Sequence, residues 1–126
     1  MRVPLSLDDF LSLPHILISF SGREGLVDHA LKGIGRRRTI HTALTHFSSV
    51  PAYLNSMRAV ATVPSHAARV LVRNSGLAIS PVPLDLGTYM VSVLCRRDVA
   101  EDPAIRWLVG IIREAFQRGV TVESGA

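Results

Sequence analysis

The sequence predicts an α/β fold in which helices flank a largely parallel sheet. Helical and strand-like patterns alternate along the chain, which is the order that βαβ units produce. The 126 residues are 48% hydrophobic, so one domain can bury a substantial core. The chain contains no internal repeat and no low-complexity stretch, which argues against a repeat architecture or a disordered protein.

The first half of the chain is expected to hold three strands, each followed by a helix. A short helix over "LDDFLSL" precedes them. Apolar and β-branched runs, or Thr-rich alternation, predict the strands, and apolar residues at helical spacing predict the helices. Gly35 is placed to stop the first of these helices, and Pro51 lies in the first turn of the second. The expected strands are 14–20, 39–47 and 58–64, and the expected helices are 23–35, 48–57 and 65–76.

The second half is expected to hold a crossover, a strand and a long helix. Pro81 and Pro83 exclude a central strand over 77–84 and indicate a crossover segment. The stretch "TYMVSVLCRR", residues 88–97, has a strongly β composition and predicts a strand. Residues 101–119 give the clearest helix, with Asp102 as its N-cap and Pro103 at its first position. Its apolar stripe consists of Ile105, Leu108, Ile112 and Phe116.

Composition narrows the class of protein. The single cysteine, Cys95, allows no intrachain disulfide, which fits a reducing compartment. No apolar run approaches the ~20 residues that cross a bilayer, and the N-terminus has no apolar core of a signal peptide. We therefore expect a cytoplasmic protein without membrane contact. The net charge of +4 is modest, and few aromatic residues lie near the arginines, so direct nucleic-acid binding is not favoured.

No set of residues predicts catalysis, a metal or a cofactor. The chain lacks GxSxG, a Gly-rich phosphate loop, HExxH and CxxC. His41 and His46 are five residues apart on an expected strand, so they face opposite sides and cannot share an ion without a bulge. Cys95 is expected to be a packed small hydrophobe, and Asp8 and Asp9 to be solvated charges at a helix start. We expect a protein that is not an enzyme.

A ligand site is expected where the strands end. Ligands of open α/β sheets bind beyond the carboxyl ends of the strands, and all three expected strands run there into small polar residues. Hydroxyls and free helical N–H groups would hold a carboxylate or another polar small molecule. Ser49 and Ser65 are expected to act as helix caps, and Arg36–Arg38 to form a solvated turn at the opposite end of the second strand. The expected ligand contacts are Ser19, Ser21, His46, Phe47, Ser48 and Thr62.

Four segments in order carry a resemblance to a known family: "LDDFLSLPHILIS", "GLVDHALKGIGRRRTIHTALTHFSSVPAYLNSM", "AVATVPSHAARV" and "DPAIRWLVGIIREAF". Together they resemble the C-terminal effector-binding domain of LysR-type transcriptional regulators, which has two lobes like a type 2 periplasmic binding protein. The resemblance implies that residues 1–84 form the second lobe with its hinge crossovers. Residues 85–126 would then be the returning strand, the C-terminal helix and the tail of the first lobe.

The resemblance also implies what the chain does and with what it assembles. It would sense a small polar or anionic effector, and DNA would be read only by a helix-turn-helix that this chain lacks. The segment 88–119 lacks its usual partners in the first lobe, so we expect a homo-oligomer, most simply a dimer, in which this segment could be exchanged. Two alternatives stay open: a solute-binding lobe of a transport-type binding protein, and a small α/β enzyme that uses Cys95 or the histidines.

Overall fold

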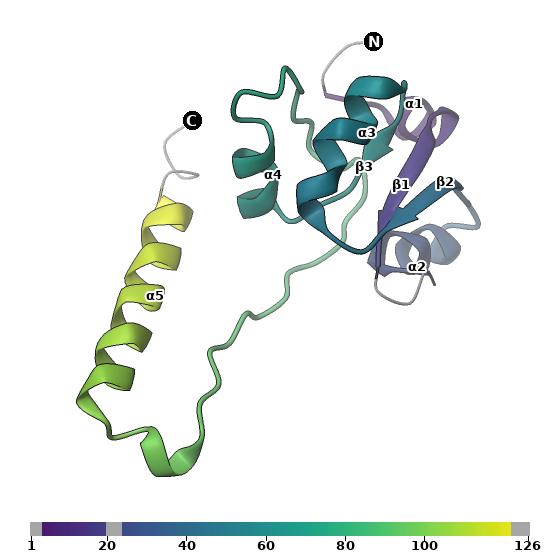
Figure 1. Ribbon diagram of the computed structural model, residues 1–126. Coiled ribbons are helices and arrows are strands. Elements are labelled where there is room, and N and C mark those ends of the chain that lie inside the picture. The colour runs from purple at the N-terminus through teal and green to yellow at the C-terminus, as the bar shows by residue number, and fades with distance from the viewer. Residues whose placement is uncertain (1–3, 20–23, 122–126) are drawn as a thin grey trace. The chain divides into compact units, whose positions relative to one another are not determined.

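The computed structural model describes residues 4–19 and 24–121 of the chain. Two compact units follow each other in the sequence, residues 1–87 and residues 88–126. The first unit contains a small sheet with flanking helices, and the second contains an extended segment that leads into a long helix (Figure 1). None of the helices within the described residues is both long and apolar enough to cross a membrane.

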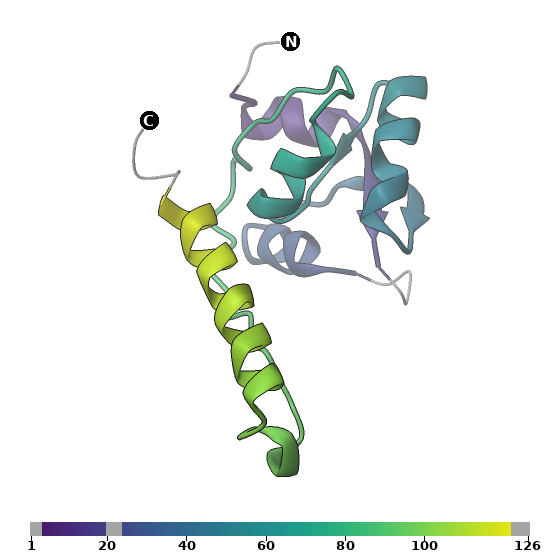
Figure 2. The ribbon, with the colours of Figure 1, turned by 60° about the vertical axis from the view of Figure 1, so that its left-hand side comes forward.

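The first unit is built on a three-stranded, fully parallel sheet with the order β2-β1-β3 (Figures 1 and 2). The predicted fold class, α/β with a parallel sheet between helices, is confirmed. Its elements are α1 (Leu7–Ser12), β1 (Pro14–Ile18), α2 (Leu26–Gly33), β2 (Thr39–Leu44), η1 (Phe47–Ser49), α3 (Val50–Ser56), β3 (Val60–Ala61) and α4 (Ser65–Leu71).

Local sequence signals explain several helix ends. The hydroxyl of Ser6 accepts a hydrogen bond from the backbone N–H of Asp9 (3.1 Å) and so caps α1. Gly35 has φ = 68°, and the backbone N–H of Arg36 donates to the carbonyl of Leu31 (2.9 Å), which closes α2 in a Schellman motif. The predicted stop at Gly35 is thereby confirmed.

The core of the first unit lies between α1, α2 and the returning segment. Phe10, Val27 and Leu31 form its buried centre. Residues from the Pro81–Gly87 region pack against this centre, among them Val82 and Leu84. The two ends of the unit also meet directly. The backbone N–H of Leu5 donates to the hydroxyl of Ser80 at 3.0 Å, so residues 75 positions apart lie side by side.

Most of the expected elements end earlier or begin later than predicted, including the helix expected at 48–57, which is Val50–Ser56. The second strand stops at Leu44 rather than at residue 47, because the chain turns there into η1. The third strand keeps only Val60 and Ala61 of the expected 58–64. The helix that starts at Ser65 ends at Leu71, and the turn after it uses positive φ at Asn74 and Gly76. The first strand and its helix are also shorter, at Pro14–Ile18 and Leu26–Gly33.

The predicted caps at Ser49 and Ser65 are wrong. Ser49 occupies the N-cap position of α3, but its side chain makes no capping hydrogen bond, because its backbone is already helical (φ = −81°, ψ = −17°). Ser65 is the first residue of α4, and Pro64 is the N-cap. A residue that has entered the helix cannot direct its hydroxyl back to the N–H groups of the first turn.

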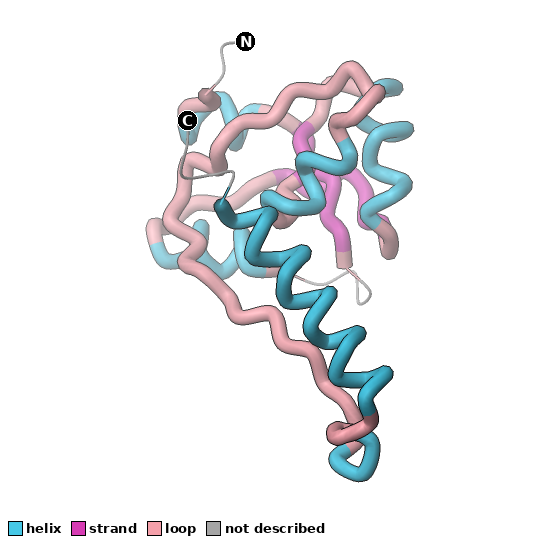
Figure 3. Tube along the Cα trace, turned by 90° about the vertical axis from the view of Figure 1, so that its left-hand side faces the viewer, coloured by secondary structure: helices cyan, strands magenta, loops and turns pink. Residues whose placement is uncertain are grey.

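The second unit consists of an extended segment, η2 (Arg97–Val99) and α5 (Pro103–Thr121) (Figure 3). The N-cap prediction is confirmed, because a carboxylate oxygen of Asp102 accepts from the backbone N–H of Ala104 at 2.8 Å. The predicted strand 88–97 is wrong. The segment forms no ladder within the described residues, because the three strands of the sheet all lie in the first unit. A β-rich composition does not make a strand without a neighbour.

Candidate functional site

The carboxyl ends of β1, β2 and β3 lie at one edge of the sheet, because all three strands run in the same direction. The register pairs Ile18 with Leu44, so the chain leaves both strands at the same level. Beyond this pair, the backbone N–H of Ser19 donates to the carbonyl of Leu44 (2.9 Å) and fixes the two exits together. On the other side of β1, Ile16 pairs with Ala61, which places Thr62 near this edge as well.

Five of the six predicted contacts lie in described parts of the chain. Ser19 directly follows β1, and Thr62 directly follows β3. His46, Phe47 and Ser48 form the exit from β2 and the start of η1. Their side chains are exposed, whereas Ser19 and Thr62 are half-buried. Ser21 lies outside the described residues. We therefore divide the predicted contacts by burial. The inner layer consists of the half-buried Ser19 and Thr62, and the outer layer consists of the exposed His46, Phe47 and Ser48 after β2.

Thr62 is the residue of this edge whose bonding is incomplete. Its Oγ1 is buried, yet it has no hydrogen-bond partner among the described residues. A buried hydroxyl without a partner costs about 1–3 kcal/mol, so such groups in folded proteins generally meet water or a ligand. The side chain of Thr62 therefore offers one donor and an acceptor at the carboxyl edge of the sheet.

The outer layer is held by its own contacts. The hydroxyl of Thr45 lies 2.8 Å from Nδ1 of His46, which orients the imidazole at the exit of β2. η1 packs against both α3 and α4, so the segment Phe47–Ser49 is fixed between two helices. Thr45 was not among the predicted contacts, although its place directly after β2 could have identified it.

The two histidines considered for a metal do not form a site. The register shifts between His15 and Ile16, which pair with Ile40 and Thr42, so that His41 is the extra residue of a bulge. Both His41 and His46 are exposed. Within the described residues, no three histidine, cysteine, aspartate or glutamate side chains come close enough to hold a metal ion.

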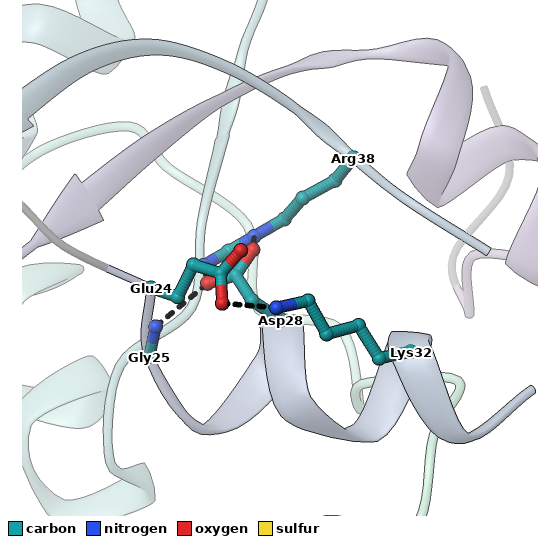
Figure 4. A network of polar contacts seen from close by, with 5 residues as sticks. All are labelled: Glu24, Gly25, Asp28, Lys32 and Arg38. Carbon is teal, nitrogen blue, oxygen red and sulfur yellow. Dashed lines mark hydrogen bonds and ion pairs between the residues drawn. The ribbon is translucent and has the colours of Figure 1, made fainter. Parts of the chain in front are cut away.

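The predicted solvated turn at the opposite end of β2 is wrong for one of its three arginines: Arg36 and Arg37 are exposed, whereas the side chain of Arg38 is buried. The side chain of Arg38 is 2% exposed and forms a two-pronged ion pair with Asp28 at 2.8 and 2.6 Å (Figure 4). Asp28 also accepts from the backbone N–H of Gly25 (2.8 Å). These bonds hold the pKa of Asp28 below its usual value. The prediction failed because no local spacing in the sequence shows that Asp28 on α2 faces Arg38.

The same cluster includes two exposed ion pairs that tie the surface of α2. Lys32, in the last turn of α2, pairs with Glu24, which precedes the helix (Figure 4). Arg36 pairs with Asp8 of α1 at 2.7 Å. Exposed pairs of this kind contribute little stability, so the buried pair of Arg38 and Asp28 is the structurally important one.

Comparisons with known proteins agree on one family. The model of the family "LysR substrate binding domain" matches residues 2–117. Nodulation protein D 1 of Rhizobium tropici is 28% identical over 117 residues, covering 91% of this chain and 38% of that protein. Nodulation protein D 1 of Rhizobium leguminosarum bv. phaseoli is 26% identical over 87 residues, covering 68% of this chain and 28% of that protein. The chain thus spans well under half the length of these relatives.

Two solved structures share the fold. The regulatory domain of MexT, a transcriptional activator in Pseudomonas aeruginosa, superposes with a TM-score of 0.69 at 33% identity, over 86% of this chain and 55% of that one. A putative transcriptional regulator from Vibrio parahaemolyticus gives a TM-score of 0.68 at 25% identity, over 93% and 55% of the two chains. The chain spans about half of each of these structures.

Proposed function

The chain belongs to the LysR substrate-binding domain family, whose members are regulatory and not enzymatic, and from this premise we propose where and what it binds. Its effector is a small polar or anionic molecule held at the carboxyl edge of the sheet. The contacts are Ser19, Ser21, His46, Phe47, Ser48 and Thr62. The observation that carries this proposal is the buried hydroxyl of Thr62 at the end of β3, which has no hydrogen-bond partner among the described residues.

Several features support a polar ligand at this edge. Thr62, Ser19 and Ser48 supply hydroxyls that can each donate and accept, which suits a carboxylate. The imidazole of His46 is oriented by Thr45 and is exposed, so it can contact a ligand that enters from solvent. The aromatic ring of Phe47 beside these groups offers an apolar surface for the rest of the molecule.

In this proposal, effector binding regulates the protein by shifting the populations of two arrangements of the lobes. An effector that binds one arrangement of the lobes more tightly than another changes the populations of both. We assign residues 1–84 to the second lobe with its crossovers, and residues 85–126 to the first. The contact between Leu5 and Ser80 supports neighbouring crossovers. DNA would be read by a helix-turn-helix elsewhere in a full-length cytoplasmic regulator.

We propose that this chain forms a homodimer. Apolar residues of the second unit are widely exposed: Met90 is 90% and Leu94 is 91% exposed. Exposed surface of this kind favours pairing with another chain. Light scattering at micromolar concentration should give about twice the monomer mass, and a monodisperse monomer would contradict the proposal.

The experiment for the ligand site compares the wild type with Thr62→Val in thermal unfolding. Valine keeps the shape of threonine and removes only the hydroxyl, so the unliganded variant should be as stable as the wild type or more stable. Acetate, succinate and benzoate serve as probes at millimolar concentration. Binding at 100 times Kd would add about 2.7 kcal/mol, which is several degrees in Tm.

We expect at least one probe to raise the Tm of the wild type and to raise that of Thr62→Val less. Thr62→Ser is the matched control, because it keeps the hydroxyl and should keep most of the shift. A shift that is equal in all three proteins would place the ligand away from β3. No shift with any carboxylate would contradict an anionic effector.

The alternative of a solute-binding lobe of a transport protein has less support. The matching family model and both matching structures concern regulatory domains or transcriptional regulators. No observation on the described residues favours transport over regulation.

A further inference from the structure

Two buried side-chain atoms of the first unit, Nδ1 of His15 and Oγ1 of Thr62, have no hydrogen-bond partner among the described residues. His15 is fully buried on the central strand β1, and Thr62 directly follows the neighbouring strand β3. Buried polar groups in folded proteins are generally satisfied by other protein groups or by ordered water. Two such atoms on neighbouring strands can share one partner.

The register places His15 and Thr62 on the same face of the sheet. His15 pairs with Val60, and partners in a parallel ladder point to the same side. Because side chains alternate along an extended chain, Thr62 lies on the same side as Val60, two residues further on. The packing agrees, since Val60 lies against the apolar core around Phe10, and the ring of His15 meets that of Phe10 at 4.5 Å. His15 and Thr62 are therefore diagonal neighbours on adjacent strands.

The spacing of diagonal neighbours fits one water molecule between them. Adjacent strands lie about 4.8 Å apart and two residues rise about 6.6 Å, so the Cα atoms of diagonal neighbours are about 8 Å apart. The imidazole of His15 and the hydroxyl of Thr62 shorten this gap from both sides. Two hydrogen bonds through one water span about 5.6 Å. Buried waters typically occupy such places, where they bond to polar groups that are otherwise unsatisfied.

The donor and acceptor roles along this line are fixed from its buried end. Nε2 of His15 lies 2.8 Å from the carbonyl of Phe10, so Nε2 donates its hydrogen and Nδ1 can only accept. A water at Nδ1 therefore donates one of its hydrogens to this atom. Its second hydrogen needs an acceptor as well, and Oγ1 of Thr62 is the unsatisfied atom on the same face. The hydroxyl of Thr62 then keeps its own hydrogen for a group outside the core.

We propose that one buried water joins Nδ1 of His15 to Oγ1 of Thr62 and makes the Thr62 hydroxyl a hydrogen-bond donor toward the effector. The proposal rests on the ligand site proposed above and deepens it, because it names His15 as a positioning residue and a hydrogen-bond acceptor as the recognised group. A carboxylate only accepts hydrogen bonds and suits this hydroxyl, whereas an ammonium group only donates them. The buried histidine thereby contributes to the choice of ligand without touching it.

The first experiment needs no ligand. Nitrogen NMR of the full chain, isotope-labelled at histidine, reports on both ring nitrogens of His15, and His15→Gln identifies their signals. Accepting a hydrogen bond lowers the chemical shift of Nδ1, so we expect this shift to rise in Thr62→Val and to stay unchanged in Thr62→Ser. Nε2 should keep its shift in both variants, because its bond to Phe10 is not altered.

The stability of Thr62→Val is compatible with this bridge. Valine removes the anchor of the water, so an immobilised molecule is released into the solvent, and a buried methyl group replaces the hydroxyl. Both effects offset the hydrogen bonds that are lost. A changed Nδ1 shift in a variant that is as stable as the wild type therefore reports on the bridge and not on partial unfolding.

The second experiment tests whether His15 acts through Thr62. Acetate binding is followed by NMR titration for the wild type, His15→Phe, Thr62→Val and the double variant. His15→Phe keeps a ring beside Phe10 and removes the acceptor, so it should weaken acetate binding about threefold or more, as the loss of one net hydrogen bond does. The double variant should bind no more weakly than Thr62→Val alone, because both changes act on one hydroxyl. Leu31→Met alters the same core without touching this line and should leave binding unchanged.

Methylammonium provides the test of ligand selection, because it has the size of acetate and the opposite hydrogen-bonding role. We expect the wild type to bind acetate and to bind methylammonium at least about tenfold more weakly, a difference of about 1.4 kcal/mol. Equal binding of both probes would show that the hydroxyl of Thr62 has no fixed direction.

Two further results would overturn the proposal. One is an Nδ1 shift that is the same in the wild type and in Thr62→Val, which would exclude the bridge. The other is additive losses in the double variant, which would show that His15 supports the fold in general. If Nδ1 depends on Thr62 but no carboxylate binds, the bridge is present, and the ligand site together with the role of this hydroxyl toward an effector is wrong.

Discussion

His15 lies at the start of the central strand and is fully buried. Its Nε2 lies 2.8 Å from the carbonyl of Phe10, and the rings of the two residues meet edge to face at 4.5 Å. Since a carbonyl only accepts, Nε2 carries the proton and Nδ1 is the bare nitrogen. Nδ1 is buried without a partner among the described residues. Burial lowers the pKa of His15 below 6.5, with the charge of Arg38 adding to this effect.

The stability of the protein should therefore fall as the pH drops below about 6.5. The unfolded chain binds a proton at His15 at a pH where the folded chain does not, so acid favours unfolding. The contribution of His15 to the free energy of unfolding is fully present above pH 6.5. It is lost progressively as the pH falls from 6.5 to the lower pKa of His15 in the folded state. Urea unfolding between pH 5 and pH 8 measures the slope.

His15→Gln is the control for this slope. Glutamine has an amide donor for the carbonyl of Phe10 and does not titrate, so its stability should change less between pH 5 and pH 7. The pair of Asp28 and Arg38 does not affect this slope. The pKa of Asp28 is lowered, so the stability that this pair contributes is lost only below about pH 3.8. An equally steep slope in His15→Gln would assign the effect to another group.

Removing one partner of the buried ion pair should be costly. Asp28→Ala leaves the guanidinium of Arg38 buried without its carboxylate and should destabilise the fold by about 3 kcal/mol. Adding Arg38→Met removes the unpaired charge and should restore part of the loss. Urea unfolding of both single variants and the double variant measures the coupling. Additive losses would show that the pair contributes no specific interaction.

At the scale of single residues, the sequence predicts some features of the structure and not others. The polar residues that follow the strands were found, because the position after a strand is visible in the sequence. The burial of Arg38 cannot be predicted in the same way, because it depends on how α2 places Asp28 beside the residue that precedes β2. Three consecutive arginines have the same local pattern whether all are solvated or one is buried.

The element scale is illustrated by the two glycines at the end of α2. Gly35 has φ = 68°, where a side chain is strained, and Gly33 lies within the helix with no positive φ. A Cβ at either position would meet no atom within 4 Å, so only the backbone conformation differs. Gly35→Ala should cost about 1 kcal/mol, and Gly33→Ala should stabilise by roughly 0.5–1 kcal/mol. Thermal unfolding of both variants compares them, and equal shifts would contradict the Schellman motif.

Every expected helix is present, whereas the expected strand 88–97 is not, and this difference has a physical reason. The caps and stops of helices, such as Asp102 and Gly35, are local and readable in the sequence. A strand extends only as far as it pairs with a neighbour, and β3 pairs with β1 only at Val60 and Ala61, although its own sequence could extend further. The segment 88–97 is the extreme case, since it has the composition of a strand and no described neighbour. The sequence does not show which strand, if any, pairs with the segment 88–97.

At the scale of the whole molecule, the two units differ in what stabilises them. All sheet pairing and every buried apolar residue of the described chain belong to the first unit. The second unit has one helix and an extended segment with exposed apolar side chains. The boundary at residues 87 and 88 coincides with this change. Stability and self-association are therefore expected to reside in different parts of the chain.

A protein that consists of residues 1–87 should fold alone and remain monomeric. It keeps the core of Phe10, Val27 and Leu31, together with Val82 and Leu84 that cover it. Its urea midpoint should match that of the dilute full-length chain, because the removed residues contribute no pairing to the sheet. Amide hydrogen exchange should protect β1 equally in both proteins.

Residues 1–79 provide the informative comparison, because they omit Ser80 and the covering residues Val82 and Leu84. This shorter protein should lose the hydrogen bond of Leu5 and expose the apolar centre between α1 and α2, so it should unfold at a much lower urea concentration. If 1–79 were as stable as 1–87, the returning segment would be dispensable for the first unit. If 1–87 itself failed to unfold cooperatively, the second unit would be required for folding.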